Sequence, residues 1–186
     1  RENPQPAFQR AIIDAVARIT HIAPGDERNE IIGSPLVSPG VITHNLTEPL
    51  PVQDEAVDYI YTEHFIEHIS REEGAALVKE CYRVLKPGGV LRISTPNLQA
   101  LTQDYVENKK DWSSWNWTTS CQMLNGSMHN WGHQFLYDFD ELGMIVNGAG
   151  FSNYKPAAWN ESTHPELCNL ETRSYNGDLI IEAVKA

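Results

Sequence analysis

The stretch that most constrains the fold runs from Val57 to Pro96. It opens with a short apolar and aromatic run, Val57–Tyr61, which is typical of a strand covered on both faces. Ser70 and Glu73 then have the spacing of a capping box, in which each side chain satisfies a backbone N–H group of the first helical turn. The helix predicted to start there has one apolar face, formed by Leu77, Val78, Cys81, Val84 and Leu85.

This helix is predicted to stop in the Lys-Pro-Gly-Gly turn of residues 86–89. Proline cannot continue the hydrogen-bond ladder of the helix, and the two glycines permit a tight reversal of the chain. A second strand is predicted over Val90–Ser94, ending at Pro96. Strand, helix and strand form a βαβ unit, which places the two strands parallel in one sheet.

The order of residues in this unit resembles the second half of a class I S-adenosylmethionine-dependent methyltransferase of the type 11-like group. The resemblance rests on EHFIEHIS at 63–70, RVLKPGG at 83–89 and VLRISTP at 90–96, in register with LTEPLP at 46–51. A weaker resemblance runs from residue 129 to residue 186. The resemblance implies an α/β fold with a Rossmann-like, mostly parallel sheet, S-adenosylmethionine as cofactor and methyl transfer as the reaction.

The region before residue 41 departs from that family. Pro6–Thr20 has the apolar spacing of an amphipathic helix, and the residues after it are predicted to be mostly loop. The Gly-x-Gly cofactor loop expected before Asn45 does not occur. Either the first βαβ unit is lost or rebuilt, or the sequence lacks a segment between Ile19 and Val41, so we expect this interval to be interrupted or to take part in a dimer. In a complete chain, the exposed sheet edge needs cover from the Pro6–Thr20 helix, from Ile31–Ile32 or from a second subunit.

Candidate cofactor-binding residues follow two predicted strands. The first strand, Val41–Leu46, ends at Asn45 and Leu46, and the resemblance implies that Asn45 meets the adenine of the cofactor. The alternative is an asparagine that only ends the strand. Ligands of open α/β sheets bind at the carboxyl ends of the strands. The turn after the next strand, expected to face the methionine part of the cofactor, supplies Thr62, Glu63 and His64.

Two pairs of histidines repeat an i, i+4 spacing, namely His64 with His68 and His129 with His133. The segment 64–68 also matches the H-x-x-E-H zinc pattern of metalloproteases. Neither pair has a third ligand or the regular helix that such a motif requires, so the sequence predicts no tightly bound metal. Because imidazole titrates near neutral pH, the candidates for a catalytic base are His68, His129 and His133. The alternative role is hydrogen bonding or substrate contact within a lid.

An insertion at about residues 104–137 interrupts the expected pattern of the domain. It contains Trp112, Trp115, Trp117 and Trp131. Two roles stay open: an aromatic lid over the substrate, or indoles that pack the insertion onto the core or onto a second subunit. After the insertion, the sequence predicts a helix and two strands separated by a polar loop, at Phe139–Gly150, Tyr154–Trp159 and Asp178–Val184.

Composition is consistent with one domain over residues 1–186. The net charge of -11 argues against nucleic acid or an anionic membrane as partner, and favours a small-molecule substrate. Three cysteines without metal-like spacing favour a cytoplasmic protein, and no apolar stretch predicts a signal peptide or a membrane span. The second interpretation of the chain is a degenerate scaffold that binds a ligand or partner without using the methyl donor. A metallohydrolase is a distant third, and a homodimer stays open.

Overall fold

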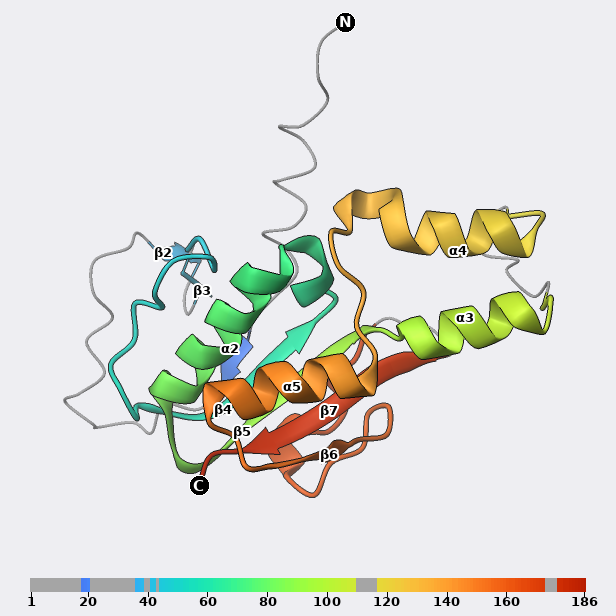
Figure 1. Cartoon of the computed structure of the whole chain (residues 1–186). Coiled ribbons are helices and arrows are strands. Elements are labelled where there is room, and N and C mark those ends of the chain that lie inside the picture. The colour runs from blue at the N-terminus through green and yellow to red at the C-terminus, as the bar shows by residue number, and fades with distance from the viewer. Residues whose placement is uncertain (1–17, 21–35, 39–40, 43, 110–116, 173–176) are drawn as a thin grey trace, which may run out of the picture.

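The computed structural model of the chain describes residues 18–20, 36–38, 41–42, 44–109, 117–172 and 177–186. Its main feature is a five-stranded sheet with the strand order β1-β4-β5-β7-β6 (Figure 1). These strands are β1 (Arg18–Thr20), β4 (Val57–Glu63), β5 (Leu85–Pro96), β6 (Asn153–Pro156) and β7 (Asp178–Val184). A separate two-stranded sheet pairs β2 (Leu36–Ser38) with β3 (Val41–Ile42).

The predicted βαβ unit is confirmed. Strands β4 and β5 pair in parallel, with Tyr59 opposite Val90 and Glu63 opposite Ser94, and helix α2 connects them. Strand β7 runs antiparallel to both β5 and β6, and β1 runs antiparallel to β4. The fold is therefore α/β, as the sequence predicts, and the sheet is mixed over the described residues.

Helix α2 (Arg71–Val84) starts at the predicted capping box. The Ser70 hydroxyl accepts a hydrogen bond from the backbone N–H of Glu73 at 3.2 Å, and the Glu73 carboxylate accepts one from the backbone N–H of Ser70 at 2.9 Å. An N-cap of this kind is worth about 1 kcal/mol. The face predicted to be apolar is buried against the sheet, through Leu77, Val78, Cys81 and Val84. The helix ends at Val84, before the predicted stop at residues 86–89, and Leu85 is the first residue of β5, which is longer than the predicted strand.

Helix α5 (Phe139–Ala149) lies beside α2 on the same face of the sheet (Figure 1). Asp138 caps its start by accepting a hydrogen bond from the backbone N–H of Glu141 at 2.9 Å. Gly150 ends it with φ 114°, a left-handed conformation that glycine adopts without steric cost. The predicted helix is thus confirmed. Of the two predicted closing strands, β7 has the predicted bounds, and β6 is shorter, ending at Pro156.

The other face of the sheet is covered by residues 157–172, which include the short helix η3 (Pro165–Leu167). Side chains alternate along β5 as expected for a strand, so Val90 contacts the cluster that contains Leu167, while Leu91 and Ile93 pack toward the helices. Within this segment, residues 161–168 were predicted to be a polar loop with no assigned role. The structure shows that they form a cover for the sheet.

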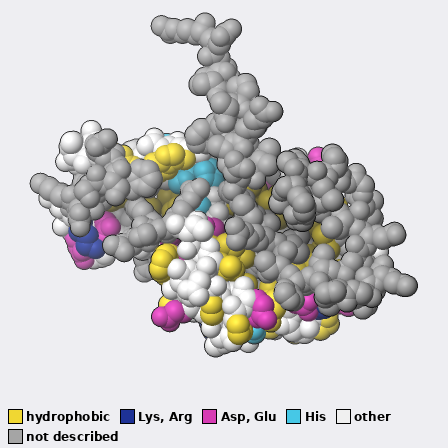
Figure 2. All heavy atoms as spheres, turned by 180° about the vertical axis from the view of Figure 1, so that it is seen from behind, with side chains coloured by type: hydrophobic (Ala, Val, Ile, Leu, Met, Phe, Trp, Pro, Cys, Tyr) yellow, Lys and Arg dark blue, Asp and Glu magenta, His cyan; other side chains and the backbone are white. Residues whose placement is uncertain are grey.

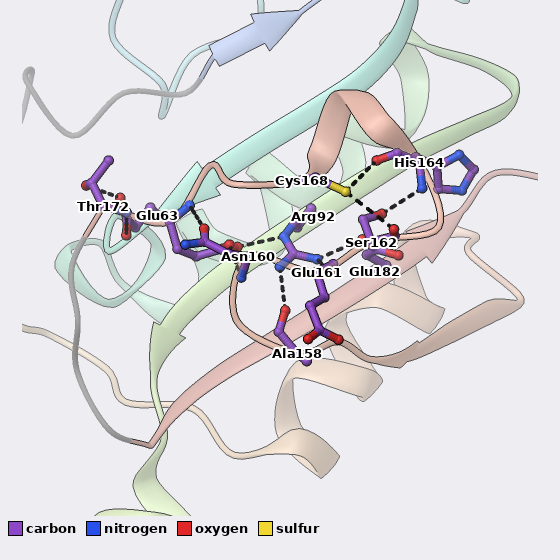
Figure 3. Close-up of polar contacts among 11 residues, drawn as sticks. Glu63, Arg92, Ala158, Asn160, Glu161, Ser162, His164, Cys168, Thr172 and Glu182 are labelled. Carbon is purple, nitrogen blue, oxygen red and sulfur yellow. Dashed lines mark hydrogen bonds and ion pairs between the residues drawn. The ribbon is translucent and has the colours of Figure 1, made fainter.

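A buried arginine anchors this cover (Figure 3). Arg92 of β5 donates to Glu171 at 2.6 Å and to Glu182 of β7 at 2.7 Å, and all three side chains are at most 2 % exposed. The same guanidinium donates to the backbone carbonyls of Ala158 and Glu161, both at 2.9 Å. We call Arg92, Glu171 and Glu182 the arginine cluster. Its hydrogen bonds tie the cover to two strands.

The insertion consists of helices α3 (Leu98–Val106) and α4 (Ser120–His129), followed by the short helix η2 (Asn130–Gly132). Helices α3 and α4 extend beyond the end of the sheet (Figure 1). They share a small apolar cluster of Leu101, Met123 and Leu136, against which Trp117 packs. Trp117 therefore packs within the insertion itself, whereas Trp112 and Trp115 lie outside the described residues.

The structure corrects the predictions for the chain before residue 47. The helix predicted over Pro6–Thr20 does not include Arg18–Thr20, which form strand β1; residues 6–17 lie outside the described residues. Pairing with the edge of β4 supplies backbone hydrogen bonds that outweigh a local helical preference. The sequence analysis expected an exposed edge on the N-terminal side of the sheet, and β1 covers the edge of β4 there. Ile31–Ile32 and residues 21–35 as a whole lie outside the described residues.

The strand predicted over Val41–Leu46 is also wrong in extent and place. Only Val41–Ile42 form a strand, and it pairs with β2 instead of joining the main sheet. Asn45 lies in a turn, because its side-chain oxygen accepts hydrogen bonds from the backbone N–H and the hydroxyl of Thr47, at 3.2 and 2.9 Å. Such local side-chain bonds compete with strand formation.

Candidate active site at the carboxyl edge of the sheet

The parallel pair β4–β5 presents its carboxyl ends at one edge, where ligands of α/β sheets bind. Strand β4 ends with Thr62 and Glu63, and His64 follows in a left-handed conformation with φ 49°. The backbone N–H of His64 donates to the carbonyl of Ser94 on β5 at 2.9 Å. Glu63 accepts hydrogen bonds from the backbone and hydroxyl of Thr172, at 2.8 and 2.7 Å. The sequence-predicted residues Thr62, Glu63 and His64 thus lie together at this edge.

His64 lies between two buried carboxylates. Its Nε2 atom is 3.0 Å from Oδ2 of Asp178, at the start of β7, and its Nδ1 atom is 3.2 Å from Oε1 of Glu67. Burial disfavours the charged imidazole, but the contacts with Asp178 and Glu67 outweigh burial and raise the pKa of His64 to about 9. His64 is therefore protonated at neutral pH. Two carboxylates then surround one positive charge.

Glu67 lies in the short helix η1 (Ile66–His68) and is fully buried. Its Oε2 atom accepts a hydrogen bond from the Thr95 hydroxyl at 2.9 Å. Burial alone would raise the pKa of Glu67, but the hydrogen bond and charge of His64 lower it, so this carboxyl is ionised. Its Oε1 atom is paired with Nδ1 of His64 at 3.2 Å and lies 3.8 Å from Nε2 of His68, without a hydrogen bond of good geometry from a described residue. Buried charged groups in proteins are paired or bind metal ions.

Backbone hydrogen bonds bring the chain around residue 133 to this carboxylate. The backbone N–H of Gln134 donates to the carbonyl of Glu67 at 2.7 Å, and its side-chain amide donates to the carbonyl of His68, also at 2.7 Å. As a result, the rings of His68 and His133 meet edge to face, with centroids 4.7 Å apart. The two histidines come from different i, i+4 pairs of the sequence. We call Glu67, His68 and His133 the histidine–glutamate cluster.

The orientation of the His133 ring is fixed by the insertion. Its Nδ1 atom lies 2.6 Å from the backbone carbonyl of Ser127. A carbonyl only accepts hydrogen bonds, so Nδ1 carries the proton, and in the neutral imidazole Nε2 keeps a lone pair. The Trp131 ring lies 5.5 Å from that of His133, and the Trp117 ring 6.0 Å from that of Trp131. The rings of Trp131 and Trp117 therefore form a row that leads from His133 into the insertion.

Three sequence-predicted site residues lie apart from these. His129 is exposed at the end of α4, and Asn45 is exposed in its turn, with Leu46 half-buried beside it. Sequence reasoning missed three contributors, Glu67, Thr95 and Asp178. Glu67 was within the quoted H-x-x-E-H segment, but nothing in the sequence pairs Thr95 or Asp178 with it. On the face shown in Figure 2, histidine side chains gather beside hydrophobic ones.

The chain matches a family model described as a methyltransferase domain over residues 7–93. A probable S-adenosylmethionine-dependent methyltransferase of Mycolicibacterium smegmatis is 45 % identical over 56 residues, which are 30 % of this chain and 21 % of that protein. These matches show that the first half of the chain is similar to S-adenosylmethionine-dependent methyltransferases. A second probable methyltransferase, from Mycobacterium tuberculosis, is 44 % identical over 57 residues, or 31 % of this chain and 20 % of that protein. The matched stretches span about a fifth of the length of these relatives.

A solved structure from Thermotoga maritima shares the fold of this chain. It is an S-adenosylmethionine-dependent methyltransferase described as a possible histamine N-methyltransferase, with a TM-score of 0.50 and 21 % identity, over 79 % of this chain and 65 % of that one. At this identity the likeness shows the fold alone. No helix in the described part of the chain is long and apolar enough to cross a membrane.

Proposed function

We propose that this chain transfers a methyl group from S-adenosylmethionine to a small-molecule acceptor. The observation that carries the proposal is the group of His64, Glu67 and Asp178 at the carboxyl edge of the parallel pair β4–β5, in a chain that matches a methyltransferase domain model. This edge is where α/β sheets bind ligands. The acidic character of the chain, with a net charge of -11, favours small and cationic acceptors over nucleic acid.

The residues at this edge suit the charges of the donor. S-adenosylmethionine carries a sulfonium and an amino group, both cationic, and an anionic carboxylate; when bound, it supplies an electrophilic methyl group. The carboxylates of Glu63, Glu67 and Asp178 suit the cationic groups, and protonated His64 suits the carboxylate. Thr62 forms the strand end beneath them. For Asn45 and Leu46 the proposal of cofactor binding rests on the family resemblance.

His133 is the proposed base for an acceptor hydroxyl. Ser127 fixes its ring so that Nε2 holds the lone pair, and His68 lies against the same ring. General-base catalysis contributes typically 10²–10⁴-fold, while alignment of donor and acceptor is worth about 7–11 kcal/mol in favourable cases. His129, exposed at the end of α4, is the weaker candidate. The contact of Trp131 with His133 supports a role for the insertion as a lid over the acceptor.

Calorimetric titration of the full chain with S-adenosylmethionine and with its demethylated product tests donor binding. We expect both to bind, and His64→Ala to weaken both. His164→Ala is the matched control, because His164 stacks on Tyr59 in the cover on the other face of the sheet. Transfer of a labelled methyl group to the small-molecule fraction of a cell extract then tests activity.

The alternative is a scaffold that binds a ligand or partner without the methyl donor. It is favoured by the lack of a Gly-x-Gly sequence before residue 45. No binding of either compound at millimolar concentration would overturn the first proposal in favour of this one. For the location of the protein we propose the cytoplasm, which the three free cysteines support.

A further inference from the structure

Three metal-ligand side chains converge in the histidine–glutamate cluster. One ligand atom from each of Glu67, His68 and His133 lies within 4.8 Å of those of the other two, and Nε2 of His68 is 3.8 Å from Oε1 of Glu67. We propose that these three residues bind one divalent transition-metal ion, with zinc as the first candidate. Two imidazoles and one carboxylate are a common donor set of catalytic zinc sites, which keep a further position open.

The carboxylate is the strongest support for this proposal. Glu67 is fully buried, and its Oε1 atom accepts no hydrogen bond of good geometry within the described residues. The Thr95 hydroxyl holds the other oxygen, so the carboxylate is fixed in orientation, as second-shell bonds fix metal ligands. Because a carboxylate oxygen has two lone pairs, Oε1 can bind an ion beside its 3.2 Å contact with Nδ1 of His64.

The ring of His133 is also fixed in orientation by a hydrogen bond. The hydrogen bond from Nδ1 to the Ser127 carbonyl leaves Nε2 as the ligand atom of the neutral ring, so a bound ion would take the lone pair that the proposed base uses. Metal-binding histidines usually donate their other N–H to a carbonyl or carboxylate. His133 is half-buried, whereas the His68 side chain is only 9 % exposed, so solvent reaches the cluster mainly at His133.

The geometry is slightly open for a loaded site. Ligand atoms about 2.0–2.1 Å from a tetrahedral zinc lie roughly 3.3 Å apart. The cluster has 3.8 Å between Glu67 and His68, and at most 4.8 Å elsewhere. Small side-chain rotations close this gap, while the hydrogen bonds of Gln134 to the carbonyls of Glu67 and His68 keep the two segments together. These hydrogen bonds bring His133 next to Glu67 and His68, so the fold supplies the third ligand that neither i, i+4 pair has in the sequence. We therefore revise the expectation of no metal.

The test uses the full chain without an affinity tag. After loading with Zn²⁺ and gel filtration, we expect elemental analysis to find one zinc per chain, and Co²⁺ to give the visible absorption of a low-symmetry site. Mn²⁺ should bind more weakly than Zn²⁺, following the Irving–Williams order. These readouts do not require methyl transfer, so failure of the proposed function would leave them unchanged.

Matched variants separate this site from adventitious binding. His133→Ala, His68→Ala and the nearly isosteric Glu67→Gln should each weaken zinc binding more than about 100-fold, since even second-shell changes cost 10–100-fold. His164→Ala and His129→Ala should retain it, and circular dichroism checks that each variant is folded. Wild-type protein without bound zinc or cobalt, or equal losses in His133→Ala and His129→Ala, would overturn the proposal and leave a hydrogen-bonded polar cluster.

Discussion

Strand β5 carries a buried polar cluster on each of its two faces. Arg92 leads to the arginine cluster under residues 157–172, and Thr95, which points to the opposite face, leads to Glu67. In the arginine cluster, one guanidinium makes four hydrogen bonds, two to carboxylates and two to backbone carbonyls. Around Glu67, one carboxylate oxygen is paired with His64 at 3.2 Å without a hydrogen bond of good geometry, and His68 and His133 lie nearby.

The difference indicates which cluster serves the fold and which serves a ligand. The four hydrogen bonds of Arg92 join residues 157–172 to strands β5 and β7, so its role is to attach these residues to the sheet. In the histidine–glutamate cluster, one ligand atom from each of three residues lies within 4.8 Å of those of the other two. A cluster whose polar contacts hold two segments of the chain together contributes to structure, whereas ligand atoms that converge at the carboxyl edge of a parallel pair indicate a binding site.

The largest expected effect comes from breaking the arginine cluster. Arg92→Met leaves the carboxylates of Glu171 and Glu182 buried without their counter-ion, and we expect a loss of about 3–5 kcal/mol in the free energy of unfolding. Urea denaturation measures it. Lys86→Met is the matched control, because its ion pair with Asp58 is partly exposed and such pairs are worth about 0–1 kcal/mol. Equal stability of Arg92→Met and wild type would contradict a structural role for this cluster.

A smaller effect is expected on the other face. Thr95→Val removes the hydroxyl that donates to Oε2 of Glu67, an oxygen of a fully buried carboxylate. Hydrogen bonds to charged groups are worth about 1.5–3 kcal/mol, so we expect a loss of that size in metal-free protein. Urea denaturation in the presence of a chelator measures it. If Thr95→Val lowered the free energy of unfolding more than Arg92→Met does, Glu67 and its partners would contribute more to stability than the arginine cluster.

The third prediction concerns a side chain that we assign to ligand binding. His133→Ala in the metal-free chain should cost about 1 kcal/mol or less, because the ring is half-buried and one hydrogen bond is lost. With zinc at 100 times its Kd, wild type should gain about 2.7 kcal/mol and the variant much less. Thermal unfolding with and without zinc compares the two. A variant that is strongly destabilised without metal would show that His133 serves the fold instead.

Local sequence signals predicted the frame of the domain. The capping box at Ser70, the βαβ unit and the helix over residues 139–150 each depend on signals within a few residues, and each is confirmed. The N-terminal predictions failed for one distant and one local reason. Residues Arg18–Thr20 form a strand because they pair with the edge of β4, which is distant in the sequence. Asn45 lies in a turn because its side-chain oxygen accepts hydrogen bonds from the nearby Thr47.

The candidate site could be predicted only in part, because some of its residues meet through contacts between distant segments of the chain. Thr62, Glu63 and His64 follow from their place after a strand. The meeting of His68 with His133 depends on Gln134, which reaches across 66 residues to the backbone of His68. Spacing along the sequence suggested the pairs 64/68 and 129/133, whereas the fold pairs 68 with 133. Tertiary hydrogen bonds of this kind leave no periodic signal.

The smallest expected effect is a difference in cysteine reactivity, which reports separately on the two faces. Burial raises the pKa of the Cys81 thiol to about 12, so at pH 8 it stays protonated beneath α2 and should react very slowly with iodoacetamide. Cys121 is exposed on α4 and should react first. Cys168 lies in the cover, where its thiol contacts the carbonyls of Ser162 and His164 at 3.4 and 3.5 Å (Figure 3).

Cys168 therefore reports whether the arginine cluster holds the cover in place. We expect its alkylation in wild type to be slower than that of Cys121, and Arg92→Met to accelerate it several-fold while Cys81 stays protected. Peptide mass spectrometry after timed alkylation resolves the three sites. Thr95→Val, which acts on the opposite face, should leave the rate at Cys168 unchanged. If both variants accelerated Cys168 equally, the two clusters would act as one cooperative unit, and the division into a structural face and a binding face would not hold.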